Sequence, residues 1–290
     1  MRRPHRLAAL SILAGLTITA SPALAQRAAR ATNPQIEIDY RPPRNASFRP
    51  IYEQLAARKV LETLQQFLAP LQLPRKLVIR VDECGGAITT AYKPDGPVTI
   101  CYEYIADIER LAPKSTVHLQ QADVTVGSAK TGPFVQAVLH AIALATFDIL
   151  KVPVWGRLDD AADRVSALIL LNFGPDVALY TIIGTAWFLA ANTTAPLDFA
   201  DERGVMAQRY YTVLCLAYGR DPQTFARFVA ANRSGLEAEP AAGDLPSARA
   251  GNCRTEYNIE AQAFRTTIMP RLDQALVKRV QEDHWLDLRN

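Results

Sequence analysis

Three consecutive apolar segments between residues 133 and 191 constrain the fold of this chain more than any other feature. Residues 133–150 are almost wholly apolar, and residues 159–173 and 176–191 are also rich in apolar side chains. Each segment has the length of a helix, and the 15 mostly apolar residues 177–191 of the third are fewer than the roughly 20 that a membrane span needs. We therefore predict a helical body built around these segments, and no membrane span in the mature chain.

The part of the chain before this body has a different pattern. Residues 48–68 carry apolar side chains at helical spacing, and residues 77–81 have the composition of a strand. Two more predicted strands, 87–92 and 98–104, flank a Lys-Pro-Asp-Gly-Pro sequence with turn chemistry. Further helices are predicted at residues 201–218, 222–231 and 256–283. The sequence thus predicts an α+β fold, in which a small antiparallel β-sheet or hairpin precedes a predominantly helical body.

The first 25 residues contain the three parts of a secretory signal. Arg2, Arg3 and Arg6 precede an apolar run, and the Ala-Leu-Ala sequence at 23–25 is a small-x-small cleavage site. We predict that residues 1–25 are a signal peptide, removed on export, and that the mature protein is secreted or periplasmic.

Predicted cleavage leaves a short leader and one domain. Residues 26–47 are polar and contain three prolines, which predicts an extended leader with few contacts. Residues 48–290 are expected to form a single domain. Within it, residues 48–132 supply one helix and the β part, and residues 133–290 supply the helical part.

The charge balance gives no support to a nucleic-acid partner. The whole sequence has a formal charge of +3. Since the predicted signal contains three arginines and no acidic residue, its removal brings the charge to zero. The last helix mixes acidic and basic residues and forms no basic stripe, so we predict no binding to nucleic acid.

All four cysteines, Cys84, Cys101, Cys215 and Cys253, follow the predicted signal. An even number of cysteines in an exported chain predicts two disulfides, and four cysteines allow three pairings. Because Cys84 and Cys101 flank the predicted hairpin, we favour Cys84–Cys101 together with Cys215–Cys253. No Cys-x-x-Cys spacing is present, which argues against a thiolate zinc cluster or a redox motif.

One segment in the middle of the chain resembles a known family. Residues 138–163, VLHAIALATFDILKVPVWGRLDDAAD, resemble exported bacterial proteins classed as metallopeptidases of the HExxH (gluzincin-like) type. In that family a zinc-binding helix leads into a Pro-x-x-Gly-Arg turn and an acidic helix start. The paired cysteines near 84 and 101, residues 208–222 and residues 245–257 resemble further segments of the family. The resemblance covers most of the mature chain and implies a zincin-like helical body.

The zinc motif itself is degenerate in this chain. In an HExxH helix, two imidazoles at i and i+4 share a face and hold zinc, and the intervening Glu activates a bound water. The resemblance places His140 at the first ligand position, Ala141 at the base and Leu144 at the second ligand. Asp159 stands at the third ligand position, where a Glu is expected. Asp163 stands where an Asp orients the first imidazole from the second shell of the site.

The resemblance therefore implies a site that has lost its chemistry. We expect no catalytic residue, because the base position is Ala141, and no bound metal or other cofactor, although zinc is the metal of the family. His140, Leu144 and Asp159 are then vestigial metal positions. If the fold persists, Asp163 still contacts His140, because a buried imidazole needs a polar partner.

Ordinary structural roles also account for these residues. A histidine on an apolar helix is more often a hydrogen-bonded core residue than a metal ligand. The acidic residues Asp159, Asp160 and Asp163 at a helix start are typical of capping and of a favourable interaction with the helix dipole. The two other histidines of the mature chain, His118 and His284, have no surroundings that indicate a ligand.

Three functions remain open on the sequence. The favoured one is an exported metallopeptidase-like pseudoenzyme that acts by binding an unknown protein or peptide. The second is an active metal-dependent peptidase or other hydrolase with a rearranged site around His140 and Asp159, aided by Asp160 or Asp163. The third is a structural or interaction protein of the cell envelope.

Overall fold

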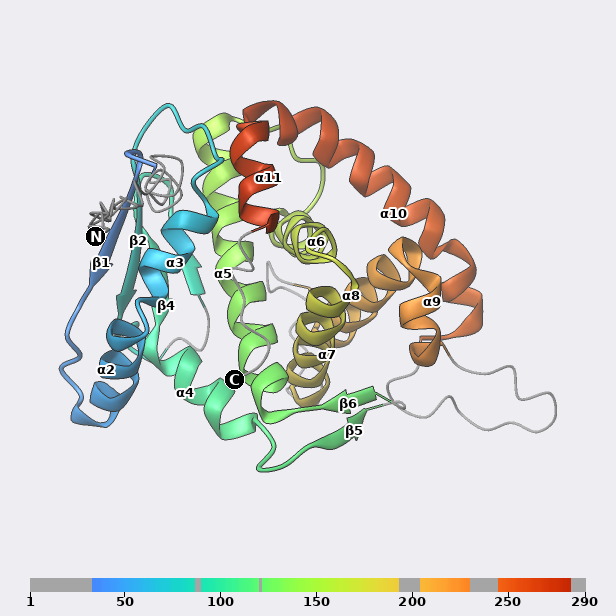
Figure 1. Cartoon of the computed structure of the whole chain (residues 1–290), viewed down its shortest axis with the longest axis horizontal. Helices are drawn as coiled ribbons and strands as arrows, with labels where there is room; N and C mark the ends of the chain where they lie inside the picture. Colours follow the sequence, from blue (N-terminus) through green and yellow to red (C-terminus); the bar gives the residue numbers. More distant parts are fainter. Residues whose placement is uncertain (1–32, 87–89, 120–121, 193–203, 230–244, 283–290) are drawn as a thin grey trace, which may run out of the picture. The chain divides into compact units, whose positions relative to one another are not determined.

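The structure is a computed structural model that describes residues 33–86, 90–119, 122–192, 204–229 and 245–282. The predicted signal peptide, residues 1–25, lies outside the described residues. Figure 1 shows the described elements, with a sheet followed by a set of helices around α5.

The N-terminal part is a four-stranded sheet with the strand order β1-β2-β4-β3. Its strands are β1 (Ile36–Tyr40), β2 (Leu77–Asp82), β3 (Thr90–Tyr92) and β4 (Val98–Cys101). β2 pairs in parallel with both β1 and β4, whereas β3 runs antiparallel to β4. The predicted α+β class is confirmed, and the sheet is mixed rather than purely antiparallel.

The parallel pairing of β1 is the reason for this difference. β1 comes from residues 26–47, where the sequence analysis expects a leader with few contacts. Instead, Ile36 lies opposite Leu77 and both side chains are buried, at 1% and 2% exposure. A parallel strand of this kind is not predicted by local turn signals, because its partner lies beyond two intervening helices.

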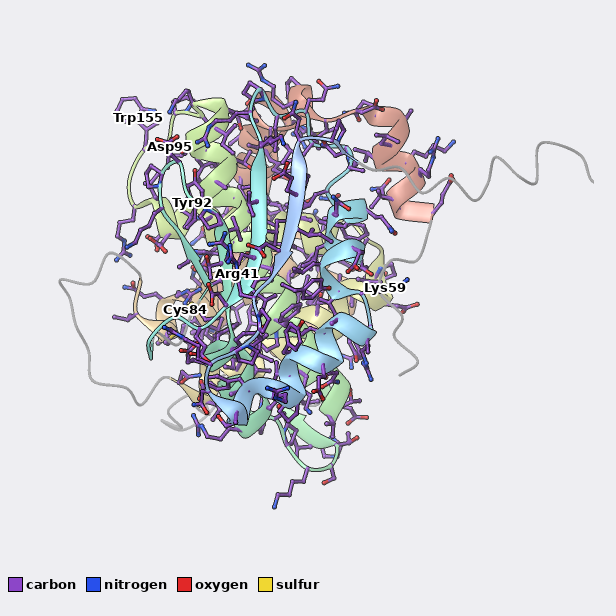
Figure 2. The ribbon with its side chains drawn as sticks, turned by 90° about the vertical axis from the view of Figure 1, so that its left-hand side faces the viewer. Arg41, Lys59, Cys84, Tyr92, Asp95 and Trp155 are labelled. Atoms are coloured by element: carbon purple, nitrogen blue, oxygen red, sulfur yellow. A yellow bond between two sulfur atoms is a disulfide. The ribbon has the colours of Figure 1, made fainter. Side chains whose placement is uncertain are left out.

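Those two helices replace the single helix predicted for residues 48–68. A short 3-10 helix η2 (Ala46–Phe48) leads into α2 (Arg49–Ala57), and α3 (Val60–Phe67) follows. Lys59 between α2 and α3 has a left-handed backbone with φ 52°, which breaks the run (Figure 2). Leu61, Leu64 and Phe67 then lie on the buried face of α3.

The segment between the sheet and the apolar helices also contains regular structure. β4 ends at Cys101, earlier than residue 104, because helix α4 (Tyr102–Leu111) begins immediately after it. A hairpin follows, formed by β5 (Val117–Leu119) and β6 (Ala122–Val124). The chain then enters the helical body.

The three apolar segments are α5 (Val126–Leu150), α6 (Leu158–Leu171) and α7 (Pro175–Ala191). α5 begins before the predicted start at Pro133, because the Thr125 side chain accepts a hydrogen bond from the Ser128 N–H at 3.0 Å and caps the helix. α5 packs against β3 and β4 on one side and against α6 and α7 on the other (Figure 1). It is the central helix of the described fold.

The crossing of α5 and α7 depends on two glycines. A Cβ atom on Gly184 would lie 1.8 Å from the Ser128 carbonyl oxygen, and a Cβ atom on Gly132 would lie 2.4 Å from the Thr181 carbonyl oxygen. Both distances are far below van der Waals contact, so only glycine permits the helices to approach this closely.

α5 is the described helix that is long and apolar enough to cross a membrane. Of its most apolar 18-residue window, 78% is buried inside the fold. The core helix of a globular domain can have the same length, composition and burial.

The C-terminal part wraps around this core. It consists of α8 (Met206–Arg220), α9 (Pro222–Phe225), η3 (Ala226–Phe228), α10 (Ser247–Thr267), η4 (Met269–Arg271) and α11 (Gln274–Glu282). The helix predicted from residue 256 begins earlier, at Ser247, and it packs along α8. The predicted 256–283 segment is therefore divided between α10, η4 and α11.

Two disulfides join Cys84 to Cys101 and Cys215 to Cys253, which is the pairing favoured from the sequence. The first links the loop after β2 to the end of β4, and the second links α8 to α10. Both are consistent with an extracellular protein.

Candidate functional site

The helix α5 presents Gln136, His140 and Leu144 at intervals of four residues, which places them along one face. Gln136 and His140 are buried, with 4% and 7% of their surfaces exposed. Leu144 is partly buried and packs in an apolar cluster with Phe147 and Ile268. Ala141, at the base position of the motif, is fully buried in the core.

Both ring nitrogens of His140 contact carboxylates from α6. Nδ1 lies 2.8 Å from Asp163 Oδ1, and Nε2 lies 3.0 Å from Asp159 Oδ1. The two aspartates are four residues apart on the first turns of α6, so they face α5 together. The contact between His140 and Asp163 expected from the sequence is therefore present.

Asp163 is the centre of a polar cluster that joins three helices. Its Oδ1 accepts a hydrogen bond from Gln136 Nε2 of α5 at 2.9 Å. From α8, Arg209 donates through Nε to Oδ2 at 2.6 Å and through Nη2 to Oδ1 at 2.9 Å, which is a bidentate pair. We call Gln136, His140, Asp159, Asp163 and Arg209 the His140 cluster.

The charges of the His140 cluster are mutually stabilised. Burial by itself would raise the pKa of Asp163, but the charge of Arg209 and the hydrogen bonds from His140 and Arg209 hold that pKa well below its usual value. Burial by itself would lower the pKa of His140, but its hydrogen bonds to Asp159 and Asp163 raise it above the ordinary value. The carboxylates at both ring nitrogens thus favour the protonated imidazole over the neutral one.

Two members of the cluster, Gln136 and Arg209, were not predicted as site residues. Gln136 precedes His140 by four residues, so helical spacing could have placed it on the same face. Arg209 lies in a segment that resembles the family, yet nothing local in its sequence indicates a partner in α6. Its role depends on the packing of α8 against α6.

The other candidate groups are not part of the His140 cluster. His118 is exposed and pairs with Asp123 within the β5–β6 hairpin. Asp160 pairs with Arg157, whose Nε lies 2.9 Å from Asp160 Oδ2, and it lines a pocket together with Asp163 and Arg209. His284 lies outside the described residues.

The donors around His140 do not fit a catalytic zinc site. Such a site normally has three protein ligands and one open position, whereas the motif positions supply one imidazole, Asp159, and the apolar side chains of Ala141 and Leu144. Among the described residues, one group of three close metal-ligand types is found, Cys84, Cys101 and Glu103, and both cysteines are in a disulfide. A cavity of about 40 Å³ adjoins His140, and Asp163 and Arg209 line a second one of about 420 Å³.

The site thus consists of a buried helix that carries His140 and a following acidic helix whose Asp159 and Asp163 contact the same imidazole. The family model DUF4344, described as "Putative metallopeptidase", matches residues 40–268, which is most of the chain. The protein therefore belongs to this family. No curated protein and no solved structure matches the chain.

Proposed function

We propose that the protein is an exported metallopeptidase-like pseudoenzyme, which does not hydrolyse peptides and acts by binding a protein or peptide. The observation that carries this proposal is the identity of two residues on the motif helix. Ala141 cannot accept a proton from a bound water, and Leu144 cannot bind a metal.

The surroundings of Ala141 and Leu144 support the proposal that the zinc site has been lost. The Ala141 site is completely enclosed by the core, and Leu144 fills its space within an apolar cluster. Each ring nitrogen of the His140 imidazole already has a carboxylate partner. These contacts satisfy a buried polar group and stabilise the contact between α5 and α6 without a metal.

Export is part of the same proposal. It rests on the signal-like residues 1–25 and on the agreement between two disulfides and an oxidising compartment. N-terminal sequencing of the protein recovered outside the cytoplasm tests it: we expect the mature chain to begin at Gln26.

Metal analysis of the purified mature protein tests the loss of the zinc site. We expect less than stoichiometric zinc, and no change in the midpoint of thermal unfolding on addition of a chelator or of zinc. Stoichiometric zinc whose removal lowers the unfolding midpoint would contradict the proposal.

Restoring the motif tests the alignment. The double variant Leu144→His with Asp159→Glu supplies the missing ligands beside His140, and we expect zinc to raise its unfolding midpoint. The matched control, Leu144→Gln with Asp159→Glu, has similar polarity but no imidazole and should not respond. Ala141→Glu is added only afterwards, because a carboxylate at this enclosed position carries a desolvation cost. A double variant that folds and ignores zinc would show that the positions are misassigned.

One observation favours a second candidate, an active hydrolase with a rearranged metal site. The 3.0 Å separation between His140 Nε2 and Asp159 Oδ1 is close to the roughly 3.3 Å between two ligands of one tetrahedral zinc ion. Chelator-sensitive cleavage of casein by the purified protein, abolished by His140→Ala and kept by the control His118→Ala, would establish this candidate. A protein without zinc and without cleavage, which binds a partner of the cell envelope, would agree with the interaction function.

A further inference from the structure

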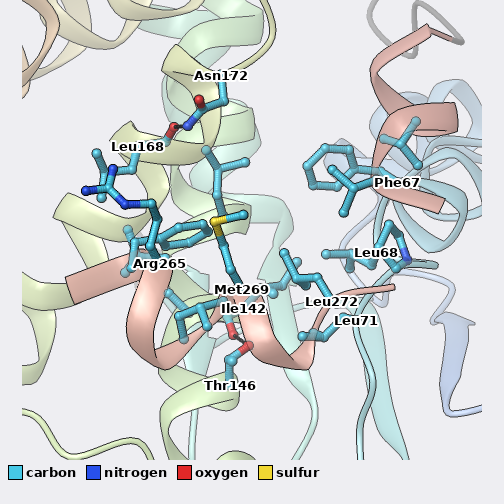
Figure 3. Close-up of a pocket in the computed structure, with 18 of the residues that line it drawn as sticks. Phe67, Leu68, Leu71, Ile142, Thr146, Leu168, Asn172, Arg265, Met269 and Leu272 are labelled. Carbon is cyan, nitrogen blue, oxygen red and sulfur yellow. Dashed lines mark hydrogen bonds between the residues drawn. The ribbon is translucent and has the colours of Figure 1, made fainter. Parts of the chain in front are cut away.

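An apolar cavity of about 280 Å³ lies on the other side of the α5–α6 pair, away from the His140 cluster. α5 and α6 form its floor, the start of the chain segment after α3 forms one wall, and α10 and α11 cover it. Figure 3 shows Leu168 and Arg265 on one side of the cavity and Phe67 and Leu68 on the other. Its volume is roughly twice the ~150 Å³ of an engineered apolar cavity that binds benzene.

The cavity is lined mainly by apolar side chains, and two of its polar lining residues, Thr146 and Asn172, are hydrogen-bonded to the helix backbone. Thr146 donates its hydroxyl hydrogen to the Ile142 carbonyl at 2.8 Å, and Asn172 Nδ2 donates to the Leu168 carbonyl at 2.7 Å. These donors are already used by the helix backbone. The interior therefore offers little to a polar ligand and favours an apolar one.

The helix α11 covers the cavity without filling it. Val277 and Val280 face the cavity, yet no residue of α11 is buried. A hydrogen bond from Gln281 Nε2 to the Asn172 carbonyl, at 3.4 Å, joins α11 to the end of α6 at the rim. Since protein interiors are normally close-packed, a space of this size under a thinly attached helix indicates room for a ligand.

Arg265 gives the rim a positive charge. It is the one Lys or Arg among the cavity-lining residues, and no Asp or Glu lines the cavity. It is also exposed, and within the described part of the chain it has no carboxylate partner. An apolar space with a single available guanidinium at its rim is complementary to a molecule with an apolar chain and an anionic head.

We propose that this cavity binds one medium-chain fatty acid, with the acyl chain between α5, α6 and α10 and the carboxylate on Arg265. The site is separate from the His140 cluster, and it does not depend on whether that cluster holds a metal.

Calorimetric titration of the purified mature protein with octanoate and with 1-octanol tests the proposal, because the two ligands share a chain and differ in the head group. We expect octanoate to bind up to about fivefold more tightly, which is the effect of one ion pair with an exposed side chain. We expect Arg265→Gln to remove this difference and Arg265→Lys to keep part of it. The matched control is Arg254→Gln, an exposed arginine of the same helix outside the cavity lining, and it should leave both affinities unchanged.

A second variant tests the chain site. Ala261→Phe places a ring in the cavity from α10 and should weaken both ligands by at least tenfold. Should this variant fail to fold, the exposed Arg265 variants still decide the question. The proposal is overturned if the wild-type protein binds neither ligand, if it binds both equally, or if Arg254→Gln acts like Arg265→Gln.

Discussion

The two sides of α5 are buried to a similar extent but are stabilised in opposite ways. Towards α7, the helix presents Gly132 and accepts the close approach of Gly184, so the contact depends on the absence of side chains. Towards α6, it presents Gln136 and His140, which hydrogen-bond to Asp163, and Asp163 is also paired with Arg209. The two contacts are neighbours along α5, because Gly132 precedes Gln136 by four residues and the same helix face continues to His140.

The largest expected effect is on the polar side. Asp163→Ala leaves Arg209 and the His140 imidazolium buried without their shared carboxylate, so we expect the free energy of unfolding to fall by about 3–5 kcal/mol. Urea unfolding of the purified variant measures this. Asp160→Asn on the same helix is the control. It breaks a partly exposed pair with Arg157 and should cost less than about 1 kcal/mol. Equal losses in the two variants would show that the His140 cluster contributes no more than a surface pair.

The next effect is on the apolar side. Gly184→Ala forces a methyl group against the Ser128 carbonyl, so α5 and α7 must separate, and we expect a loss of at least about 2 kcal/mol. Gly251→Ala in α10 is the matched control, because a Cβ atom there meets nothing within 4 Å. That change should raise stability by about 0.5–1 kcal/mol, since alanine favours the helix. If Gly184→Ala left the free energy of unfolding unchanged, α5 and α7 would have to lie further apart at their crossing than the structure places them.

The smallest effect is the pH dependence, which distinguishes the two sides because only the polar one titrates. The pKa of His140 is raised in the folded state, so its contribution is fully present below the unfolded value of about 6.5 and is lost as pH rises through the folded pKa. The lowered pKa of Asp163 gives a contribution that is present above about pH 4 and is lost on acidification. We therefore expect the unfolding free energy of the wild type to fall as pH rises above about 6.5, and to fall less in His140→Gln. Parallel pH profiles for the two proteins would contradict this assignment.

The helical body follows from local patterns in the sequence, whereas parts of the sheet do not. The three apolar segments become α5, α6 and α7, because burial of apolar faces is a property of each segment. The strand β1 pairs with residues about forty positions away, and no local pattern specifies that pairing. The break between α2 and α3 depends on the left-handed backbone of Lys59. A lysine rarely adopts this conformation, so its presence in the sequence does not predict the break.

The site was predictable to the extent that it lies on sequence-adjacent helices. His140, Asp159 and Asp163 come from α5 and α6, and helical spacing together with the family resemblance placed them near each other. Arg209 comes from α8, and its contact with Asp163 depends on how three helices pack. The apolar cavity could not be predicted either, because its wall combines residues from four separated parts of the chain.

The bond between Cys215 and Cys253 joins the helix that carries Arg209 to the helix that carries Arg265. Gly219 lies against the Cys253 carbonyl, so the two helices are in close contact beside the bond as well. A thiol reductant that opened this bond would remove the covalent link between the two helices. The spacing of the two arginines, one largely buried and one exposed, would then depend on the packing of α8 against α10 alone.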